Sequence, residues 1–276
     1  MRIDTHQHFW RYDPREYAWI DGALAPLRRD FLPDDSAPEM ARVGFHACIA
    51  VQARQTADET PWLLQLADTH RTIAGVIGWV DLQADDARER VRRAALHPKL
   101  LGLRHVVQDE PGDFLTRPAF LRGVRSLAEF GLTYDVLIYE RQMPAALEFV
   151  RTCPELRFVL DHVGKPDIRH GRFDDWARQL KHLAGCANVT CKLSGLVTEA
   201  EWRTWTPAAL RPYVETAAEY FSPERLLVGS DWPVCTVAGT YASTMAVVME
   251  VVDTWPASAR DAVLGGNAAR LWNLPR

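Results

Sequence analysis

The feature that most constrains the fold is a pair of histidines near the start of the chain, His6 and His8, taken together with Asp231 near its end. Histidines two positions apart lie on the same face of a β-strand, because strand side chains alternate between the two faces. Asp231 closes a second apolar run, which begins at Leu226. Residues of a first and a last strand can meet only if the strands curl round into a closed barrel. The sequence therefore predicts a barrel with a metal-binding or proton-transfer site at its rim.

Apolar runs of strand length alternate with amphipathic segments of helix length. The runs are rich in Val, Ile and Leu on both faces, as is typical of parallel strands that are covered on each side. The expected strands are Arg2–His8, Ala47–Gln52, Ile73–Asp81, Leu101–Val107, Leu132–Tyr139, Arg157–His162, Asn188–Leu193 and Leu226–Asp231. The expected helices are Thr60–Thr69, Asp85–Leu96, Pro118–Phe130, Gln142–Cys153, Phe173–Leu183, Pro207–Phe221 and Tyr241–Val252. This alternation predicts an α/β fold, a (β/α)8 TIM barrel in which residues 1–276 form a single domain.

Two segments depart from the simple alternation. The stretch from Phe9 to Pro38 is too long for a plain connection between a strand and a helix. We expect it to be an extended loop over the barrel mouth that helps form the substrate pocket, and a peripheral decoration is the alternative. The stretch from Ala257 to Trp272 is expected to form an extra C-terminal helix.

Charge and cysteine content exclude several classes of protein. The formal net charge is −4 with both signs interspersed, so the basic stripe that binds nucleic acid is missing. Charged residues interrupt every long apolar stretch, and neither a signal peptide nor a membrane span is expected. The five cysteines show no CxxC spacing and are expected to be buried, reduced thiols. These features favour a cytoplasmic protein with no nucleic-acid or membrane partner.

Polar and ionisable residues stand where several of the expected strands end. In a (β/α)8 barrel the active site lies at the C-terminal ends of the strands. Charges close to a core need partners, so such a set is costly to assemble without a function. The residues at these ends are His6, His8, Arg104, His105, Tyr134, Asp135, Tyr139, Asp161, His162, Lys192, Ser194 and Asp231.

Five motifs give the chain a resemblance to the amidohydrolase superfamily. They are Asp4–Trp10, Asp161–Pro166, Cys191–Leu196, Gly229–Pro233 and Gly266–Trp272. Together they resemble the amidohydrolase-2 branch, which holds sugar lactonases such as fuconolactonases and rhamnonolactonases and the related pyrone-dicarboxylate lactonase. The resemblance covers essentially the whole chain. It implies a hydrolase that opens a sugar-acid lactone, such as an L-fuconolactone-like aldonolactone, to the free aldonic acid in carbohydrate catabolism.

The chain departs from the fuller superfamily pattern in its ligand set. The fourth strand offers Arg104 and His105 in place of a bridging Lys or Glu, and the fifth strand has no histidine. A binuclear metal centre is therefore not expected. One divalent ion, zinc for preference, could be held by the ligand set His6, His8 and Asp231, with His162 as a further candidate. A reaction without metal stays open, since the pyrone-dicarboxylate lactonase that the chain resembles works without one.

Lactone hydrolysis needs an activated water, a polarised carbonyl and a proton for the leaving alkoxide. Asp231 is the candidate general base, because a carboxylate is deprotonated near neutral pH. His162 is the candidate for orienting the water or carrying a proton. The cations Arg104 and Lys192 are candidates for stabilising the oxyanion or binding ring oxygens. A structural salt bridge beneath the rim is the alternative for Lys192.

The expected substrate-binding residues are Trp10, Tyr139, Trp232 and His105. Sugar faces stack well on flat aromatic rings. Trp10 could instead only anchor the long loop, and His105 could support a ligand rather than contact the substrate. The few arginines at the rim favour a neutral aldonolactone over a dicarboxylate, which would be expected to use several arginine forks.

Three other functions compete with this prediction. A metal-dependent decarboxylase and a dicarboxylate (pyrone) lactonase belong to the same superfamily. A non-catalytic sugar-binding barrel is the third, but His6, His8, His162 and Asp231 are all present. The sequence leaves the choice of lactone, its ring size and the oligomeric state open, a homo-oligomer included.

Overall fold

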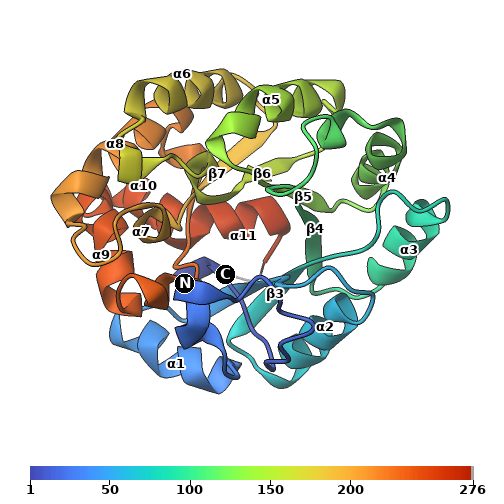
Figure 1. Ribbon diagram of the computed structural model, residues 1–276, viewed down its shortest axis with the longest axis horizontal. Coiled ribbons are helices and arrows are strands. Elements are labelled where there is room, and N and C mark those ends of the chain that lie inside the picture. Colours follow the sequence, from blue (N-terminus) through green and yellow to red (C-terminus); the bar gives the residue numbers. More distant parts are fainter. Residues whose placement is uncertain (275–276) are drawn as a thin grey trace.

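The computed structural model describes residues 1–274 of the 276-residue chain. Eight parallel strands follow one another round a single sheet in chain order (Figure 1). The strands are β1 (Ile3–Gln7), β2 (Ala47–Val51), β3 (Ile73–Gly78), β4 (Leu100–Val106), β5 (Thr133–Leu137), β6 (Phe158–Leu160), β7 (Val189–Leu193) and β8 (Leu226–Val228). Nearly every strand residue is buried, because helices cover the outer face and side chains fill the interior. The predicted (β/α)8 architecture is confirmed.

The barrel closes where the segments after β8 and at the end of β1 pair. The Asp231 amide donates to the His6 carbonyl at 2.9 Å, and the His8 amide donates to the Trp232 carbonyl at 2.7 Å. Thr5 adds a side-chain hydrogen bond to the Val228 carbonyl at 2.8 Å. The predicted meeting of the first and last strands is therefore made by backbone hydrogen bonds, which also bring His6, His8 and Asp231 to one place.

The surrounding helices agree with the predicted ranges to within about three residues. They are α2 (Glu59–Thr69), α3 (Ala87–Ala94), α4 (Pro118–Glu129), α5 (Met143–Thr152), α6 (Phe173–Ala184), α8 (Pro207–Phe221) and α9 (Tyr241–Val252). Two further helices were not predicted, α1 (Pro33–Arg42) and the single turn α7 (Leu196–Glu199). Within residues 1–274, no helix has both the length and the hydropathy needed to cross a membrane.

The segment after β1 is part loop and part helix. Backbone hydrogen bonds of 2.9 Å in both directions join Trp10 to Phe31 and close a loop between them. The 3-10 turn η1 (Gly22–Leu27) of this loop contacts η7 (Val234–Val237), which follows β8, so the loop lies at the mouth as predicted. The predicted loop range up to Pro38 is too long, because α1 already begins at Pro33, a residue suited to a first helical position.

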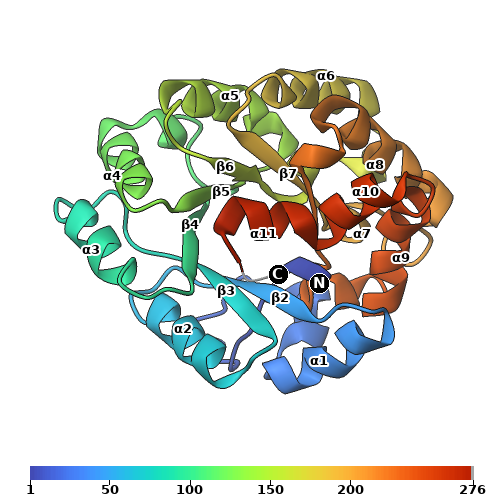
Figure 2. The same ribbon diagram turned by 180° about the vertical axis from the view of Figure 1, so that it is seen from behind.

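The C-terminal segment closes the opposite end of the barrel. The predicted continuous helix is divided into α10 (Ala257–Asp261), η8 (Ala262–Gly266) and α11 (Asn267–Trp272). At Gly265 the backbone passes so close to the Met1 carbonyl that a Cβ atom would lie 2.1 Å from its oxygen, which explains the break. Figure 2 shows α11 crossing the middle of the strand ring, where Ala268 and Trp272 pack against interior residues of the strands. The mouth at the C-terminal ends of the strands is thus the end left for a site.

Candidate active site

Three imidazoles converge on one carboxylate at the mouth of the barrel. The Asp231 Oδ1 atom lies 3.4 Å from His8 Nε2, 3.8 Å from His6 Nε2 and 3.9 Å from His162 Nε2. His6 belongs to β1, and the other three follow the ends of β1, β6 and β8. Each of the four side chains is at most 7% exposed. We refer to His6, His8, His162 and Asp231 as the outer centre.

The outer centre is held in an unusual backbone. Asp231 has a φ of 61° and His162 has a φ of 53°, both in the left-handed region that non-glycine residues seldom adopt. Such conformations cost free energy and persist where the surrounding structure requires them, most often at functional sites. Here they turn both side chains from the ends of short strands into the mouth.

Burial and neighbouring charges set the protonation states of the outer centre. Burial lowers the pKa of His162 to about 4, with Asp231 opposing the shift. Burial likewise lowers the pKa of His6 well below its usual value. For Asp231, burial opposes ionisation, but His162, His8 and His6 together hold its pKa below the usual range. At neutral pH the outer centre therefore holds an ionised carboxylate beside the neutral imidazoles of His6 and His162.

The arrangement of acceptor atoms fits a single metal ion. The Nδ1 atom of His8 lies 2.8 Å from the Val51 carbonyl and must donate to it, which leaves the lone pair on Nε2 when the ring is neutral. That atom faces His6 Nε2 at 3.2 Å and the Asp231 carboxylate at 3.4 Å. Zinc bonds of about 2.0–2.2 Å in a tetrahedron imply ligand separations of about 3.3–3.6 Å. His6, His8 and Asp231 can hold such an ion, with His162 beside it.

Beneath the outer centre lies a second polar cluster whose charges cancel. The Lys192 ammonium of β7 is 2.5 Å from Asp135 of β5 and 3.0 Å from Asp161. The Arg104 guanidinium of β4 is 3.1 Å from the other oxygen of Asp161. All four side chains are almost fully buried. We refer to Arg104, Asp135, Asp161 and Lys192 as the inner network.

Arg104 is the link between the two clusters. Its Nε and Nη2 donate to the side chain of Gln52, and Nη2 also donates to the Gln52 backbone carbonyl at 2.5 Å. Its Nη1 lies 3.2 Å from His6 Nε2. Of the two predicted catalytic cations, Arg104 therefore reaches the outer centre. Lys192 approaches only the far nitrogen of His6, Nδ1, at 3.3 Å.

Two of the aromatic residues predicted to bind substrate are packed inside the protein. Trp10 is fully buried and donates to the Arg29 carbonyl at 2.9 Å. Trp232 is 4% exposed and packs edge-on against Phe31. Both therefore anchor the long loop at the mouth, which is the alternative that the sequence left open for Trp10.

His105 and Tyr139 lie in different surroundings. The His105 ring stacks on Phe114, accepts from Trp79 Nε1 at 3.2 Å and lies 3.0 Å from Glu110. It points away from the barrel interior, because Arg104, the residue before it on β4, points inward. Tyr139 is only partly buried and follows β5 at the rim, where the Arg141 guanidinium lies 4.7 Å from the centre of its ring.

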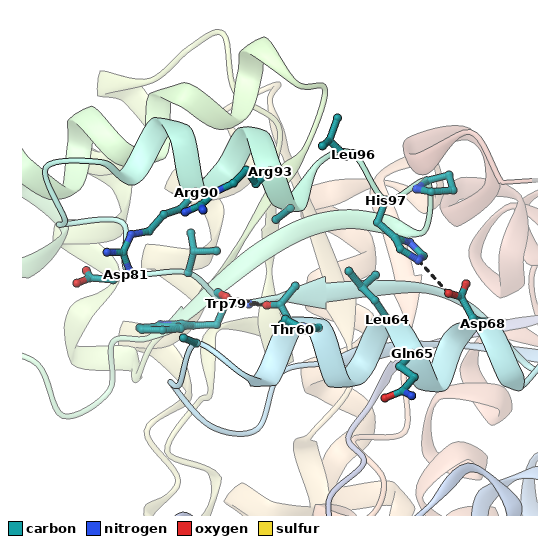
Figure 3. A pocket seen from close by; sticks show the side chains of 15 residues that line it. Thr60, Leu64, Gln65, Asp68, Trp79, Asp81, Arg90, Arg93, Leu96 and His97 are labelled. Atoms are coloured by element: carbon teal, nitrogen blue, oxygen red, sulfur yellow. Dashed lines mark hydrogen bonds and ion pairs between the residues drawn. The ribbon is translucent and has the colours of Figure 1, made fainter.

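A separate hollow lies on the outside of the barrel. A cavity of about 830 Å³ opens between α2 and α3, and Figure 3 shows Leu64, Trp79 and Leu96 among its walls. Its charged residues are already engaged within the chain: Asp68 with His97 at 3.2 Å, and Arg90 with Asp86 at 2.6 Å. The outer centre is not part of this cavity.

The sequence predicted that His6, His8 and Asp231 would converge. It did not predict the contacts of the residues beneath them. Asp135 and Asp161 were recognised as strand-end residues, yet their pairing with Lys192 and Arg104 was not predicted. Gln52 was taken only as the end of a strand. Alternation provides the missing signal, since Asp135 on β5 pairs in register with Arg104 on β4, and side chains of paired residues point to the same face.

The sequence is similar to those of proteins of known family and activity. A family model described as Amidohydrolase matches residues 3–274. The chain is 43% identical to an L-fucono-1,5-lactonase of Burkholderia multivorans, over 100% of this chain and 97% of that protein. It is 38% identical to an L-fucono-1,5-lactonase of Burkholderia ambifaria, with the same coverage.

Solved structures agree with these relatives. An amidohydrolase from Burkholderia multivorans, crystallised with bound zinc, matches this chain with a TM-score of 0.95 and 41% identity, with 100% of both chains covered. An amidohydrolase 2 from Bifidobacterium longum subsp. infantis matches with a TM-score of 0.75 at 22% identity, with 99% of both chains covered, and shows a shared fold.

Proposed function

The chain belongs to the amidohydrolase family, and from this premise we propose that it hydrolyses a sugar-acid lactone, L-fucono-1,5-lactone or one very similar, to the free aldonic acid. Two L-fucono-1,5-lactonases are 43% and 38% identical to it over its whole length. The observation in the structure that supports the proposal most strongly is the outer centre, in which three imidazoles face an ionised carboxylate at the barrel mouth.

Asp231 is the general base of this proposal. It turns Oδ1 toward the three imidazoles, so its other oxygen is the one to accept a proton from the attacking water. The water oxygen then bonds to the lactone carbonyl carbon. When the ring C–O bond breaks, the departing alkoxide takes the proton that Asp231 accepted, and His162, whose Nε2 lies 3.9 Å from Asp231 Oδ1, is the candidate for orienting the water beside this carboxylate.

Two cationic groups are candidates for stabilising the carbonyl oxygen as it gains charge. Arg104 reaches the outer centre with Nη1, which also donates to Asp161, while Gln52 holds Nε and Nη2 in place. A zinc ion held by His6, His8 and Asp231 would polarise the carbonyl and lower the pKa of a bound water. Lys192 acts beneath them by keeping Asp135 and Asp161 neutralised.

We place the enzyme in the cytoplasm. Within the described chain all five cysteines are free thiols, and four of them are buried. A reducing compartment keeps such thiols reduced.

The test is a panel of aldonolactones, fucono-, rhamnono- and arabinono-lactones included, assayed by proton release near pH 7. Each lactone is run untreated, after chelation, and after zinc is added back. We expect hydrolysis of at least one six-carbon lactone, with activity lost on chelation and regained with zinc. The control for the Asp231→Asn variant is Asp253→Asn, which changes an exposed carboxylate after α9. This control should behave as the wild type.

A wild-type protein that hydrolyses none of these lactones would overturn the proposal. Release of carbon dioxide from a conjugated acid would then favour a decarboxylase, and hydrolysis of a pyrone dicarboxylate would favour the other lactonase.

A further inference from the structure

An ion pair stands at the rim of the barrel beside the outer centre. Lys165 follows β6, Glu199 ends α7 after β7, and Tyr139 follows β5, so three successive rim segments meet. The Lys165 ammonium lies 2.7 Å from Glu199 Oε1 and 5.9 Å from the centre of the Tyr139 ring. The Lys165 side chain is 15% exposed and that of Glu199 is 17% exposed, so both are mostly covered and still reachable.

The backbone that carries Lys165 is strained. His162, Val163, Gly164 and Lys165 have φ values of 53°, 47°, 74° and 50°, four successive residues in the left-handed region. Three of them are not glycine, and each costs about 1–2 kcal/mol in that conformation. A segment that keeps such a cost is held in place by its surroundings, and such segments cluster at functional sites.

This turn ties the rim pair to the outer centre. The Lys165 amide donates to the His162 carbonyl at 2.8 Å, which makes a tight turn with three residues per repeat. In such a turn the first and fourth side chains lie on the same side. Lys165 is therefore held beside His162, and the carboxylates of Glu199 and then Asp231 raise the pKa of Lys165 against the effect of burial.

The chemistry of the pair selects its ligand. An ammonium that must stabilise an oxyanion serves best without a counter-charge, but Glu199 neutralises Lys165. A sugar hydroxyl both donates and accepts, so it matches an adjacent carboxylate and ammonium, each of which keeps unused hydrogen-bonding capacity. Tyr139 stands beside the pair, with the Arg141 guanidinium 4.7 Å and the Lys165 ammonium 5.9 Å from the centre of its ring. Glu199 and Asp231 would together repel a carboxylate group on the substrate.

We propose that Lys165 and Glu199 form a subsite, backed by Tyr139, that binds the ring hydroxyls of the lactone and makes the enzyme select neutral polyhydroxylated substrates. This inference rests on the proposed function and adds to it the residues that determine specificity. In this proposal the outer centre performs the hydrolysis, and Lys165 and Glu199 determine which lactone binds next to it.

The experiment compares two lactones in the intact protein. One is L-fucono-1,5-lactone, and the other is the unsubstituted six-membered lactone, which has no hydroxyl to bind. For Lys165→Met and for Glu199→Leu we expect the ratio of kcat/KM for the first lactone over the second to fall about 10- to 100-fold, as for the loss of a hydrogen bond to a charged group. The fall should lie mainly in KM. The two variants stand on separate rim segments, so one remains informative if the other folds poorly.

Matched controls are available on the outer helices. Lys181 of α6 places its ammonium 5.7 Å from the Tyr220 ring, the same arrangement as Lys165 and Tyr139 but far from the mouth. Glu219 of α8 is exposed. Lys181→Met and Glu219→Leu should leave the ratio within about twofold of wild type, and the melting temperature of each variant reports on folding.

The outcomes separate two failures. If the wild type hydrolyses neither lactone, the proposed function is wrong, and the proposed hydroxyl subsite is then wrong as well. If the wild type is active but both rim variants lose activity equally on the two lactones, or keep the wild-type ratio, hydrolysis stands and the hydroxyl subsite is wrong.

Discussion

The outer centre and the inner network are both clusters of four buried ionisable residues, but their charges are arranged differently. In the inner network two cations face two carboxylates at 2.5–3.1 Å, and the charges cancel. In the outer centre one carboxylate faces three imidazoles, and their nitrogen atoms and the Asp231 oxygen approach one another at 3.2–3.8 Å. The charges of the inner network therefore balance without a ligand, whereas the ligand atoms of the outer centre can hold a cation.

This difference indicates which of the buried charged residues take part in the reaction and which hold the structure in place. Buried charges without partners are costly, so a balanced network serves to hold side chains in place. An arrangement that brings nitrogen and oxygen ligand atoms this close together can be stabilised by a bound cation. Lys192, which sequence reasoning counted among the catalytic candidates, lies in the balanced cluster, and Asp231 lies in the unbalanced one.

The largest effect is expected from Asp231→Asn, which removes the charge of the outer centre. Asparagine adopts the left-handed conformation found at this position more readily than most residues, so we expect the free energy of unfolding to change by less than about 1 kcal/mol. Loss of a general base should lower kcat about 10³-fold or more. Steady-state hydrolysis and chemical denaturation check the two parts, and a kcat within tenfold of wild type would show that Asp231 is not the base.

Lys192→Met should damage the fold rather than the chemistry alone. Removing the ammonium leaves Asp135 and Asp161 facing each other without their shared partner, and breaking a buried pair in this way costs about 3–5 kcal/mol. Urea denaturation measures the loss.

A double variant sharpens that prediction. Lys192→Met combined with Asp135→Asn should recover part of the stability, because Asp161 keeps Arg104 at 3.1 Å. A single Lys192→Met variant as stable as wild type, with turnover abolished, would instead place Lys192 in the chemistry.

His162→Asn should act on turnover more than on folding. Asparagine can keep the hydrogen bond that His162 Nδ1 makes with Ser194 Oγ at 2.9 Å but cannot reproduce Nε2, which faces Asp231. We expect kcat to fall about 10²-fold with a small change in melting temperature. His182→Asn, an exposed histidine of α6, is the matched control. Normal turnover in His162→Asn would remove this residue from the outer centre.

The smallest effect is the pH dependence between neutrality and mild acid. The pKa of His162 is lowered to about 4 by burial, so the neutral imidazole persists until the pH falls toward that value. Activity should therefore be nearly constant from pH 7 down to about 5 and decline below it. Rates measured as a function of pH and corrected for spontaneous lactone hydrolysis would reveal this decline in activity. A decline centred near pH 6.5, the ordinary value for histidine, would contradict a neutral, buried His162.

The sequence predicted most of the fold because the signals were local. Eight apolar runs, the spacing of His6 and His8, and the apolar run ending at Asp231 were enough for the barrel and the outer centre. The inner network was harder to predict, because Arg104 and His105 are neighbours of similar polarity and only the register of β4 decides which one points inward. The break in the last helix depends on the contact of Gly265 with Met1, residues far apart in the chain.

The measurement that tests the contrast most directly is a calorimetric titration of zinc into metal-free wild type and metal-free Asp231→Asn. Two sets of residues could bind an ion: His6, His8 and Asp231, or His6, Asp161 and His162. Lys192 and Arg104 already neutralise Asp161, so we predict one zinc per chain in the wild type and affinity at least tenfold weaker in Asp231→Asn. Two ions per chain, or one ion bound equally well by both proteins, would contradict the account.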